Sequence, residues 1–291
     1  MLICRTINEI REFVRQARER GQTIGLVPTM GYFHEGHLSL MREAKKACAA
    51  VVVSIFVNPL QFGPQEDFHQ YPRDFERDRK MARETGVDAI FYPSVEEMYP
   101  AGFSTHVEVG GLTECLCGLS RPGHFLGVAT VVAKLFNIVL PDKAFFGRKD
   151  AQQALVIRRM VRDLNMPVEI VTVPIVREPD GLAMSSRNVY LSLRERTAAR
   201  VLFRSLKIAE QAAAGGEKDV ARLQEAVRQE IASEPLAQIE YVEIRALPGL
   251  EPISRLQGPA LLALAVRIGK TRLIDNTVLD PEGDPLAFDH V

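Results

Sequence analysis

The stretch Val51-Val52-Val53-Ser54-Ile55-Phe56-Val57 is the most informative part of the chain for its fold. Its nearly continuous apolar character suits a strand that is covered on both faces, as the strands of parallel sheets are. A second strand is predicted at residues 23–27, and residues 38–49, between the two strands, are predicted to form a helix. A strand, a helix and a strand in this order imply a right-handed crossover and a parallel sheet.

The same alternation continues through the first two-thirds of the chain. Further strands are predicted at residues 89–92, 144–146 and 168–173, and further helices at 74–85, 128–139 and 151–164. After about Arg177 the order changes, with helices predicted at 194–213 and 220–233 and strands at 239–245, 260–268 and 271–279. We therefore predict an α/β fold: a Rossmann-like parallel sheet flanked by helices over residues 1–176, followed by a small α+β domain over residues 177–291.

Composition and charge exclude several classes of protein. The 36 basic and 37 acidic residues nearly cancel and form no basic block, which gives no support for a nucleic-acid partner. The four cysteines form no C-x-x-C pair and suit reduced thiols in the cytoplasm. The longest apolar stretches, residues 128–140 and 259–266, are too short to span a bilayer, so no membrane partner is expected. Residues 280–291, rich in Pro, Gly and Asp, are expected to be loosely held.

The motif His34-Glu35-Gly36-His37 follows the strand predicted at residues 23–27, where a helix is expected to begin. The N-terminus of a helix exposes unpaired N–H groups and attracts phosphate. Two imidazoles there can add hydrogen bonds to charge that develops on a phosphoryl group. A zinc pair or two surface histidines capping the helix are the alternatives, and zinc is disfavoured because no further Cys or His lies nearby. The motif favours a site for a nucleoside triphosphate.

Three other polar clusters have a functional and a structural interpretation. Gln61, in the turn after residues 51–57, can hold a carboxylate and a hydroxyl, or can simply face water. In the segment around Phe146-Gly147-Arg148-Lys149-Asp150, glycine allows close approach of a ligand and lysine suits phosphate oxygens, although an ordinary capped helix explains it too. Met184-Ser185-Ser186-Arg187 can fold over a triphosphate or serve as a polar linker.

Together these clusters resemble the pantothenate synthetase (pantoate–β-alanine ligase) family over about residues 1–280. The matching segments, in order, are Val27-Pro28-Thr29-Met30-Gly31, His34-Glu35-Gly36-His37, Ser54-Ile55-Phe56-Val57-Asn58-Pro59, Gln61-Phe62-Gly63, Phe145-Phe146-Gly147, Lys149-Asp150 and Met184-Ser185-Ser186-Arg187-Asn188. The histidine pair and the serine loop are also similar to the two signatures of class I aminoacyl-tRNA synthetases and related nucleotidyltransferases. One departure is Arg148, where the family usually has an acidic residue; we expect altered ATP affinity only if its side chain faces the site.

The resemblance implies a Rossmann-like fold and condensation of pantoate with β-alanine through a pantoyl adenylate, with ATP cleaved to AMP and diphosphate. It implies Mg²⁺, a homodimer, and a C-terminal domain that carries the Met184–Arg187 loop as a lid. The residues it implies for catalysis are His34, His37, Lys149, Ser185 and Arg187. Those for ATP are Met30, His34, His37, Gly147, Lys149, Asp150, Val176, Met184, Ser185, Ser186 and Arg187. Those for pantoate are Gln61 and Gln153, with Gln61 also facing β-alanine.

Magnesium is expected to bind mainly through the ATP phosphates, with Asp78 or Asp150 as possible carboxylate partners. Arg121 and His124 resemble a loop on the substrate side that shields the intermediate. Three alternatives remain: a nucleotidyltransferase acting on a phosphorylated acceptor, an ATP sensor without turnover, and a tRNA-charging enzyme. The paired glutamines favour a hydroxy acid over the first, intact His37, Lys149 and Arg187 argue against the second, and the lack of a basic face argues against the third.

Overall fold

The computed structural model describes residues 1–283 and Phe288, so most of the tail predicted to be loosely held lies outside the described residues. The chain forms two compact units. The first comprises residues 1–110, 121–148 and 153–176, and the second comprises 111–120, 149–152 and the residues from 177 onward. The chain thus passes from one unit to the other after Val176, but two short segments of the predicted first domain belong to the second unit.

The side chain of Gln152 joins those two short segments within the second unit. Its Nε2 donates to the carbonyl oxygens of Leu112 and Cys115, at 2.8 Å each, and its Oε1 accepts from the backbone N–H of Cys117 at 2.9 Å. Each of these polar atoms is buried, so the three bonds satisfy groups that would otherwise be costly to desolvate. No local sequence pattern predicts hydrogen bonds between a side chain and the backbone of a segment so distant in the sequence.

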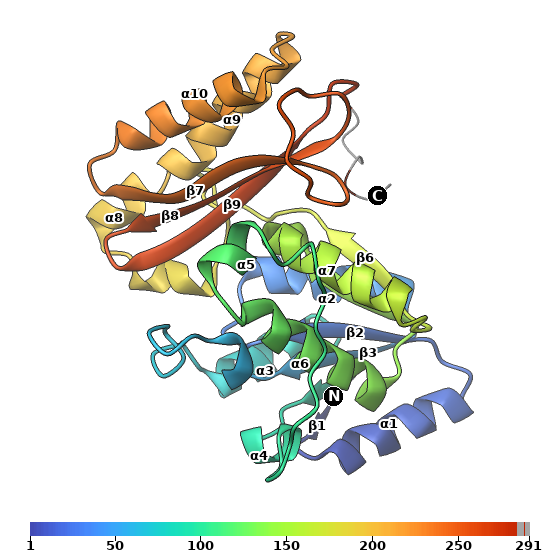
Figure 1. Ribbon diagram of the computed structural model, residues 1–291. Helices are drawn as coiled ribbons and strands as arrows, with labels where there is room; N and C mark the ends of the chain where they lie inside the picture. The colour runs from blue at the N-terminus through green and yellow to red at the C-terminus, as the bar shows by residue number, and fades with distance from the viewer. Residues whose placement is uncertain (284–287, 289–291) are drawn as a thin grey trace. The chain divides into compact units, whose positions relative to one another are not determined.

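The first unit is built on a six-stranded parallel sheet (Figure 1). Its strands, in the spatial order β1-β4-β3-β2-β5-β6, are β1 (Leu2–Cys4), β4 (Ala89–Phe91), β3 (Ala50–Ile55), β2 (Ile24–Thr29), β5 (Lys143–Gly147) and β6 (Glu169–Val173). Every residue of β3 is buried, which confirms the strand predicted from its apolar run. The sequence analysis missed β1, an edge strand of three residues whose partner lies far away in the sequence.

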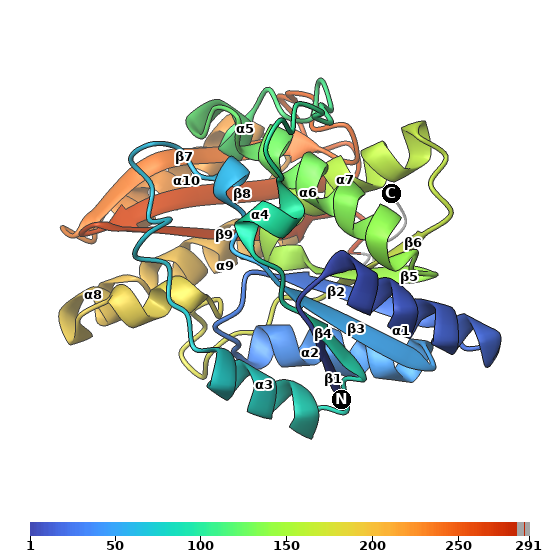
Figure 2. The ribbon, with the colours of Figure 1, turned by 90° about the horizontal axis from the view of Figure 1, so that it is seen from below.

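Helices cover both faces of this sheet. Figure 2 shows α1 (Ile7–Glu19), α6 (His124–Val139) and α7 (Ala151–Asp163) on one face, and α2 (Glu35–Ala47) and α3 (Phe75–Glu84) on the other. The sequence analysis also missed α1, although Thr6 and Glu9 form a capping box at its start. Helix α6 is buried along nearly its whole length and forms core. Of the helices in the described residues, none is long and apolar enough to cross a membrane.

The second unit contains a three-stranded antiparallel sheet. Strands β7 (Ala237–Ala246), β8 (Ala260–Ile268) and β9 (Thr271–Leu279) lie in that order, and α9 (Val201–Ala214) and α10 (Val220–Ala232) pack on one face (Figure 1). The helix predicted at 194–213 is two helices, α8 (Leu193–Ala198) and α9, because a turn at Ala199 and Arg200 interrupts the helix. The short helices α4 (Val95–Met98) and α5 (Leu116–Ser120) complete the chain, α4 in the first unit and α5 in the second.

All four cysteines, Cys4, Cys48, Cys115 and Cys117, are free and at most 8% exposed. Burial raises the pKa of the Cys4 thiol to about 11, and it also raises the pKa values of the Cys48 and Cys115 thiols. These thiols are therefore core side chains, consistent with the predicted absence of disulfides.

The direction in which the chain winds reverses at β2. From β2 the chain continues to β3 on one side, whereas β5 occupies the other side of β2. In open parallel sheets, ligands bind beyond the carboxyl ends of the strands at such a switch point. The loop after β2 and the end of β5 are therefore the place where a ligand site is expected.

Candidate active site

The loop between β2 and α2 is held by Asp78, a residue of α3. The backbone N–H of Tyr32 donates to Asp78 Oδ2 at 2.6 Å, and that of Phe33 donates to Asp78 Oδ1 at 2.7 Å. Tyr32 adopts a φ of 52°, a left-handed conformation that these two bonds help to maintain. Asp78 is 1% exposed; burial raises the pKa of its carboxyl group, and the two backbone bonds oppose that rise.

Both carboxylate oxygens of Asp78 are thus engaged with backbone. The structure gives Asp78 the role of fixing the loop that leads to His34. Asp150, the other carboxylate considered for magnesium, lies on the surface of the second unit, with its side chain 48% exposed. Among residues 1–283 and Phe288, no three His, Cys, Asp or Glu side chains are grouped to hold a metal ion.

His34 and His37 cap the N-terminus of α2 through their own rings. His34 is the N-cap residue, and its Nδ1 accepts from the backbone N–H of Gly36 at 3.2 Å. The backbone N–H of His34 in turn donates to Nδ1 of His37 at 3.3 Å. An Nδ1 atom that accepts a hydrogen bond carries no proton, so each neutral ring carries its proton on Nε2. The cap therefore supplies two Nε2–H donors where a helix already favours anions.

Gln61 follows β3, in the short 3-10 turn η1 (Pro59–Gln61). Its Nε2 lies 3.4 Å from Sδ of Met30, and its Oε1 accepts from Nδ2 of Asn58 at 3.1 Å. Asn58 is 1% exposed; its Nδ2 also donates to the carbonyl of Gly127, and its Oδ1 accepts from the Tyr99 hydroxyl at 2.8 Å. The amide of Gln61 is therefore oriented through Asn58, a residue to which the sequence analysis gave no role.

A second set of contacts holds the backbone of the same turn. Arg121 forms a two-pronged ion pair with Glu66 at 2.6 and 2.7 Å, and both Arg121 and His124 reach the carbonyl of Gln61, at 3.3 and 3.0 Å. Glu66 Oε2 also accepts from the backbone N–H of Gly63 at 3.1 Å. Burial alone would raise the pKa of Glu66, but the hydrogen bonds and charge of Arg121 outweigh it and bring that pKa to about 2. Glu66, Arg121 and His124 thus clamp the turn that carries Gln61.

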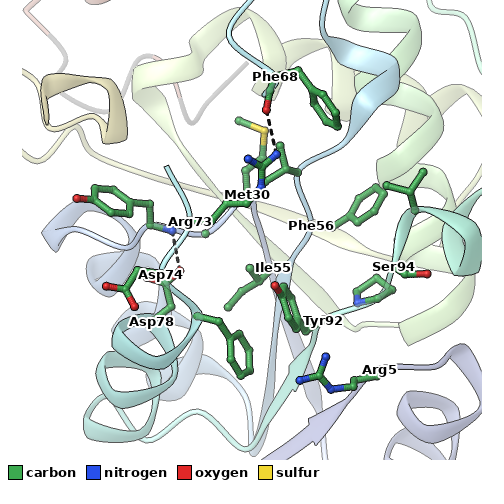
Figure 3. A pocket seen from close by; sticks show the side chains of 16 residues that line it. Arg5, Met30, Ile55, Phe56, Phe68, Arg73, Asp74, Asp78, Tyr92 and Ser94 are labelled. Carbon is green, nitrogen blue, oxygen red and sulfur yellow. Dashed lines mark hydrogen bonds between the residues drawn. The ribbon is translucent and has the colours of Figure 1, made fainter. Parts of the chain in front are cut away.

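A cavity of about 300 Å³ opens at the carboxyl ends of β3 and β4 (Figure 3). Met30, Phe56 and Tyr92 are among the side chains that line it, and Arg5 lies over the ring of Tyr92 at 5.4 Å. Its lining includes Met30 but neither histidine of the cap and neither Gln61 nor Gln153. The cavity is therefore a neighbour of the predicted site and does not contain its reactive groups.

The remaining predicted residues of the first unit lie at the ends of β5 and β6. Gly147 ends β5, and a Cβ added there would meet nothing within 4 Å. Arg148 and Gln153 are half-buried, and Val176 is the last residue of the unit. The first unit thus holds the predicted residues Met30, His34, His37, Gln61, Gly147, Gln153 and Val176.

The second unit holds the other predicted phosphate-binding residues: Lys149, Asp150, Met184, Ser185, Ser186 and Arg187. Lys149 Nζ lies 3.8 Å from Asp150 Oδ2. Ser185 caps the turn η3 (Ser186–Tyr190), and its hydroxyl accepts from the backbone N–H of Arg187 at 3.2 Å. Ser186 is buried, whereas Ser185 and Arg187 are half-buried.

A doubly flanked parallel sheet with a histidine-capped helix after the strand where its winding reverses defines a nucleotide-binding α/β enzyme. Residues 2–278 match the sequence profile of the family described as Pantoate-beta-alanine ligase. The chain belongs to this family, and its reaction is the ATP-dependent condensation of pantoate with β-alanine to pantothenate, AMP and diphosphate.

Similar proteins agree with this assignment over nearly the whole chain. The pantothenate synthetase of Pelotomaculum thermopropionicum is 66% identical over 279 residues, which are 96% of this chain and 99% of the relative. The crystal structure of pantothenate synthetase from Thermus thermophilus matches with a TM-score of 0.91 at 50% identity, covering 95% of this chain and 99% of that one. A structure of pantoate-beta-alanine ligase from Francisella tularensis, complexed with beta-gamma ATP and beta-alanine, matches with a TM-score of 0.80 at 33% identity, covering 98% and 99% of the two chains.

Proposed function

We propose that the histidine cap of α2 is the phosphate-binding centre of the ligation. In the first step a carboxylate oxygen of pantoate attacks the α-phosphorus of ATP, the bond from that phosphorus to the bridging oxygen breaks, and diphosphate leaves. Negative charge builds up on phosphate oxygens in this step. Donors that are already oriented stabilise such charge without reorganisation. The reciprocal cap of His34 and His37, which places the ring protons on Nε2, is the observation that carries this proposal.

The second unit supplies the positive charge for the leaving diphosphate in this proposal. Lys149 and Arg187 contact phosphate oxygens, with Ser185 and Ser186 donating from the turn they begin. Met30, Gly147, Asp150, Val176 and Met184 complete the nucleotide site. The C-terminal domain, from residue 177 onward, acts as a lid that brings the Met184–Arg187 loop onto the triphosphate.

Gln61 and Gln153 hold pantoate, and Gln61 also faces β-alanine. The β-alanine amine attacks the carbonyl carbon of the adenylate, the bond from that carbon to the AMP oxygen breaks, and the amine proton passes to solvent. The chain supplies alignment of the two reactants in this step, which alone contributes on the order of 7–11 kcal/mol in favourable cases. Asn58, Glu66 and Arg121 support it by orienting Gln61 through the bonds described above.

Magnesium enters with ATP in this proposal and neutralises phosphate charge. The fit is supported by the lack, among the described residues, of any cage of three metal-binding side chains, because Mg²⁺ commonly completes its octahedron with phosphates and water. Asp150, the residue after Lys149, has an exposed carboxylate that could contact the magnesium ion. A cytoplasmic homodimer is also proposed, as the resemblance to the family implies. The four buried free thiols suit a reducing compartment.

The test is diphosphate release from ATP and Mg²⁺ in the presence of D-pantoate, with and without β-alanine. A single-turnover burst with pantoate alone, and pantothenate with AMP only when both substrates are present, is the expected result. ATP binding without diphosphate release in any combination would instead support a nucleotide sensor. Sedimentation equilibrium tests the homodimer, for which twice the chain mass of 32.4 kDa is expected.

A further inference from the structure

Two neighbouring residues of β9, Asp275 and Asn276, carry buried polar side chains that the ligation scheme does not use. Asp275 is 2% exposed and Asn276 is 6% exposed. Burying a carboxylate or an amide costs free energy unless its polar atoms are hydrogen-bonded, so each of these side chains needs a hydrogen-bond partner. Their partners lie in two different segments of the second unit.

Asn276 is bonded to the segment that carries Lys149. Its Nδ2 donates to the carbonyl oxygen of Lys149 at 2.8 Å. Lys149 begins a stretch of four residues, 149–152, that belongs to the second unit although the chain around it belongs to the first. This bond therefore ties the backbone of Lys149 directly to strand β9.

Asp275 is bonded to the segment that leads to the serine loop. Nη1 and Nη2 of Arg177 donate to its two oxygens at 2.6 and 3.0 Å, a two-pronged ion pair, and Arg177 Nη1 also reaches the carbonyl of Gly181 at 3.1 Å. The guanidinium lies 4.7 Å from the centre of the Phe203 ring, on α9. A paired, planar guanidinium of this kind fixes orientation as well as charge.

Arg177 opens a tight hairpin whose other side runs into Met184. Arg177 pairs with Ala183, and the backbone N–H of Glu178 donates to the carbonyl of Leu182 at 2.9 Å. Asn188, beyond the loop, closes the structure by donating to the carbonyl of Ala183 at 3.1 Å. The loop Met184–Arg187 is thus enclosed by bonds that lead back to Arg177 and through it to Asp275.

We propose that Asp275 and Asn276 are positioning residues for ATP, holding Lys149 and the Met184–Arg187 loop on one strand so that both meet the triphosphate in a fixed arrangement. This inference rests on the proposed phosphate-binding roles of Lys149 and that loop. In this inference Asp275 and Asn276 make no direct contact with the nucleotide. They act through the carbonyl of Lys149 and through Arg177, each across a bond given above.

The test compares Asn276→Ala with Thr277→Val. Thr277 is the next residue of β9, and its hydroxyl donates to Glu210 on α9 at 2.7 Å, away from both segments. Asn276→Ala is expected to lower kcat/KM for ATP about tenfold, the effect of one lost buried hydrogen bond, and to leave KM for pantoate unchanged. Thr277→Val is expected to leave both unchanged. An unchanged kcat/KM for ATP in folded Asn276→Ala would overturn the inference.

A double-mutant cycle separates positioning from general destabilisation. If Asn276 acts through Lys149, Asn276→Ala lowers kcat/KM for ATP much less in a Lys149→Ala background than in the wild type. Equal factors in both backgrounds overturn the inference. If Lys149→Ala itself leaves kcat/KM for ATP intact, the proposed phosphate role of Lys149 fails first and the inference fails with it.

Arg177→Lys provides a second route that does not depend on Asn276. Lysine keeps the charge opposite Asp275 but cannot form the two-pronged pair. We expect the fold to be retained, by circular dichroism, and kcat/KM for ATP to fall several-fold with KM for pantoate unchanged. A matching rise in both Michaelis constants would indicate a merely structural pair and overturn the role of Asp275.

Discussion

The backbone N–H of His34 donates to the ring of His37, and the centres of the two imidazole rings lie 4.1 Å apart. This makes His37 both a structural acceptor through Nδ1 and a candidate phosphate donor through Nε2. The sequence left open whether this pair caps a helix or binds phosphate. The structure shows the cap, and the cap fixes which ring nitrogen carries the proton, so the two interpretations are compatible.

Substituting His37 with asparagine is expected to separate these two roles. Asparagine can still accept from the backbone of His34 but lacks the Nε2–H donor. We therefore expect His37→Asn to reduce the rate of adenylate formation about 10²- to 10³-fold while the dissociation constant of ATP changes little. Single-turnover diphosphate release and calorimetric titration with ATP measure the two quantities. Equal losses in binding and rate would contradict a role specific to the transition state.

The adjacent glutamines Gln152 and Gln153 are expected to respond in opposite ways to alanine. Both polar side-chain atoms of Gln152 form hydrogen bonds with the backbone, three in all. Gln152→Ala should therefore lower the free energy of unfolding by about 1–3 kcal/mol. Gln153→Ala should leave stability intact and raise KM for pantoate about tenfold, with KM for ATP unchanged. Urea unfolding and steady-state kinetics on both variants check the contrast, and a stability loss confined to Gln153→Ala would reverse the assignment.

Two glycines offer another matched pair. A Cβ on Gly127 would collide with the carbonyl group of Leu60, in the turn that carries Gln61, whereas a Cβ on Gly147 meets nothing. Gly127→Ala should therefore destabilise the fold by about 1–3 kcal/mol and raise KM for pantoate. Gly147→Ala should be neutral for unfolding but raise KM for ATP if the nucleotide lies against that backbone. An unchanged KM for ATP would remove Gly147 from the proposed site.

Glu66 is expected to make stability depend on acid pH. Its pKa is about 2 in the folded chain, compared with 4.5 for an unperturbed carboxyl group, so its contribution is present above about 4.5 and is lost as the pH falls towards 2. Glu66→Gln should remove that contribution and be destabilised most at neutral pH, by about 1–3 kcal/mol. Urea midpoints at pH 6 and pH 3 provide the comparison. The difference between wild type and variant must shrink at pH 3 for the assignment to stand.

Much of the fold follows from local pattern. The strands predicted at 260–268 and 271–279 coincide with β8 and β9. The ends of such strands can be predicted from neighbouring residues alone, because turns bound their alternating and apolar runs. The missed elements have other causes. Strand β1 is too short to show a period, and its pairing with β4 joins segments almost ninety residues apart. Helix α1 did carry a signal, the Thr6 and Glu9 capping box, which the sequence analysis overlooked.

The candidate site residues also divide into those that a local pattern predicts and those that depend on tertiary contacts. His34, Gln61 and Lys149 belong to short motifs, so the sequence could nominate them. Asp78 and Asn276 could not be given their roles in advance, because each acts on a backbone group that only tertiary folding brings within reach. A carboxylate inside a predicted helix looks like a metal ligand or a surface charge until its hydrogen-bond donors are counted, which explains why Asp78 was considered for magnesium.

The burial of all four thiols makes this chain suitable for site-directed labelling. Maleimides react with exposed thiolates, and these side chains are shielded from reagent, with the pKa values of three of them raised. One cysteine introduced on the surface of each unit would therefore take up a pair of fluorophores with little background. Energy transfer between the dyes, recorded before and after addition of ATP, would report directly on whether the two units move relative to each other during turnover.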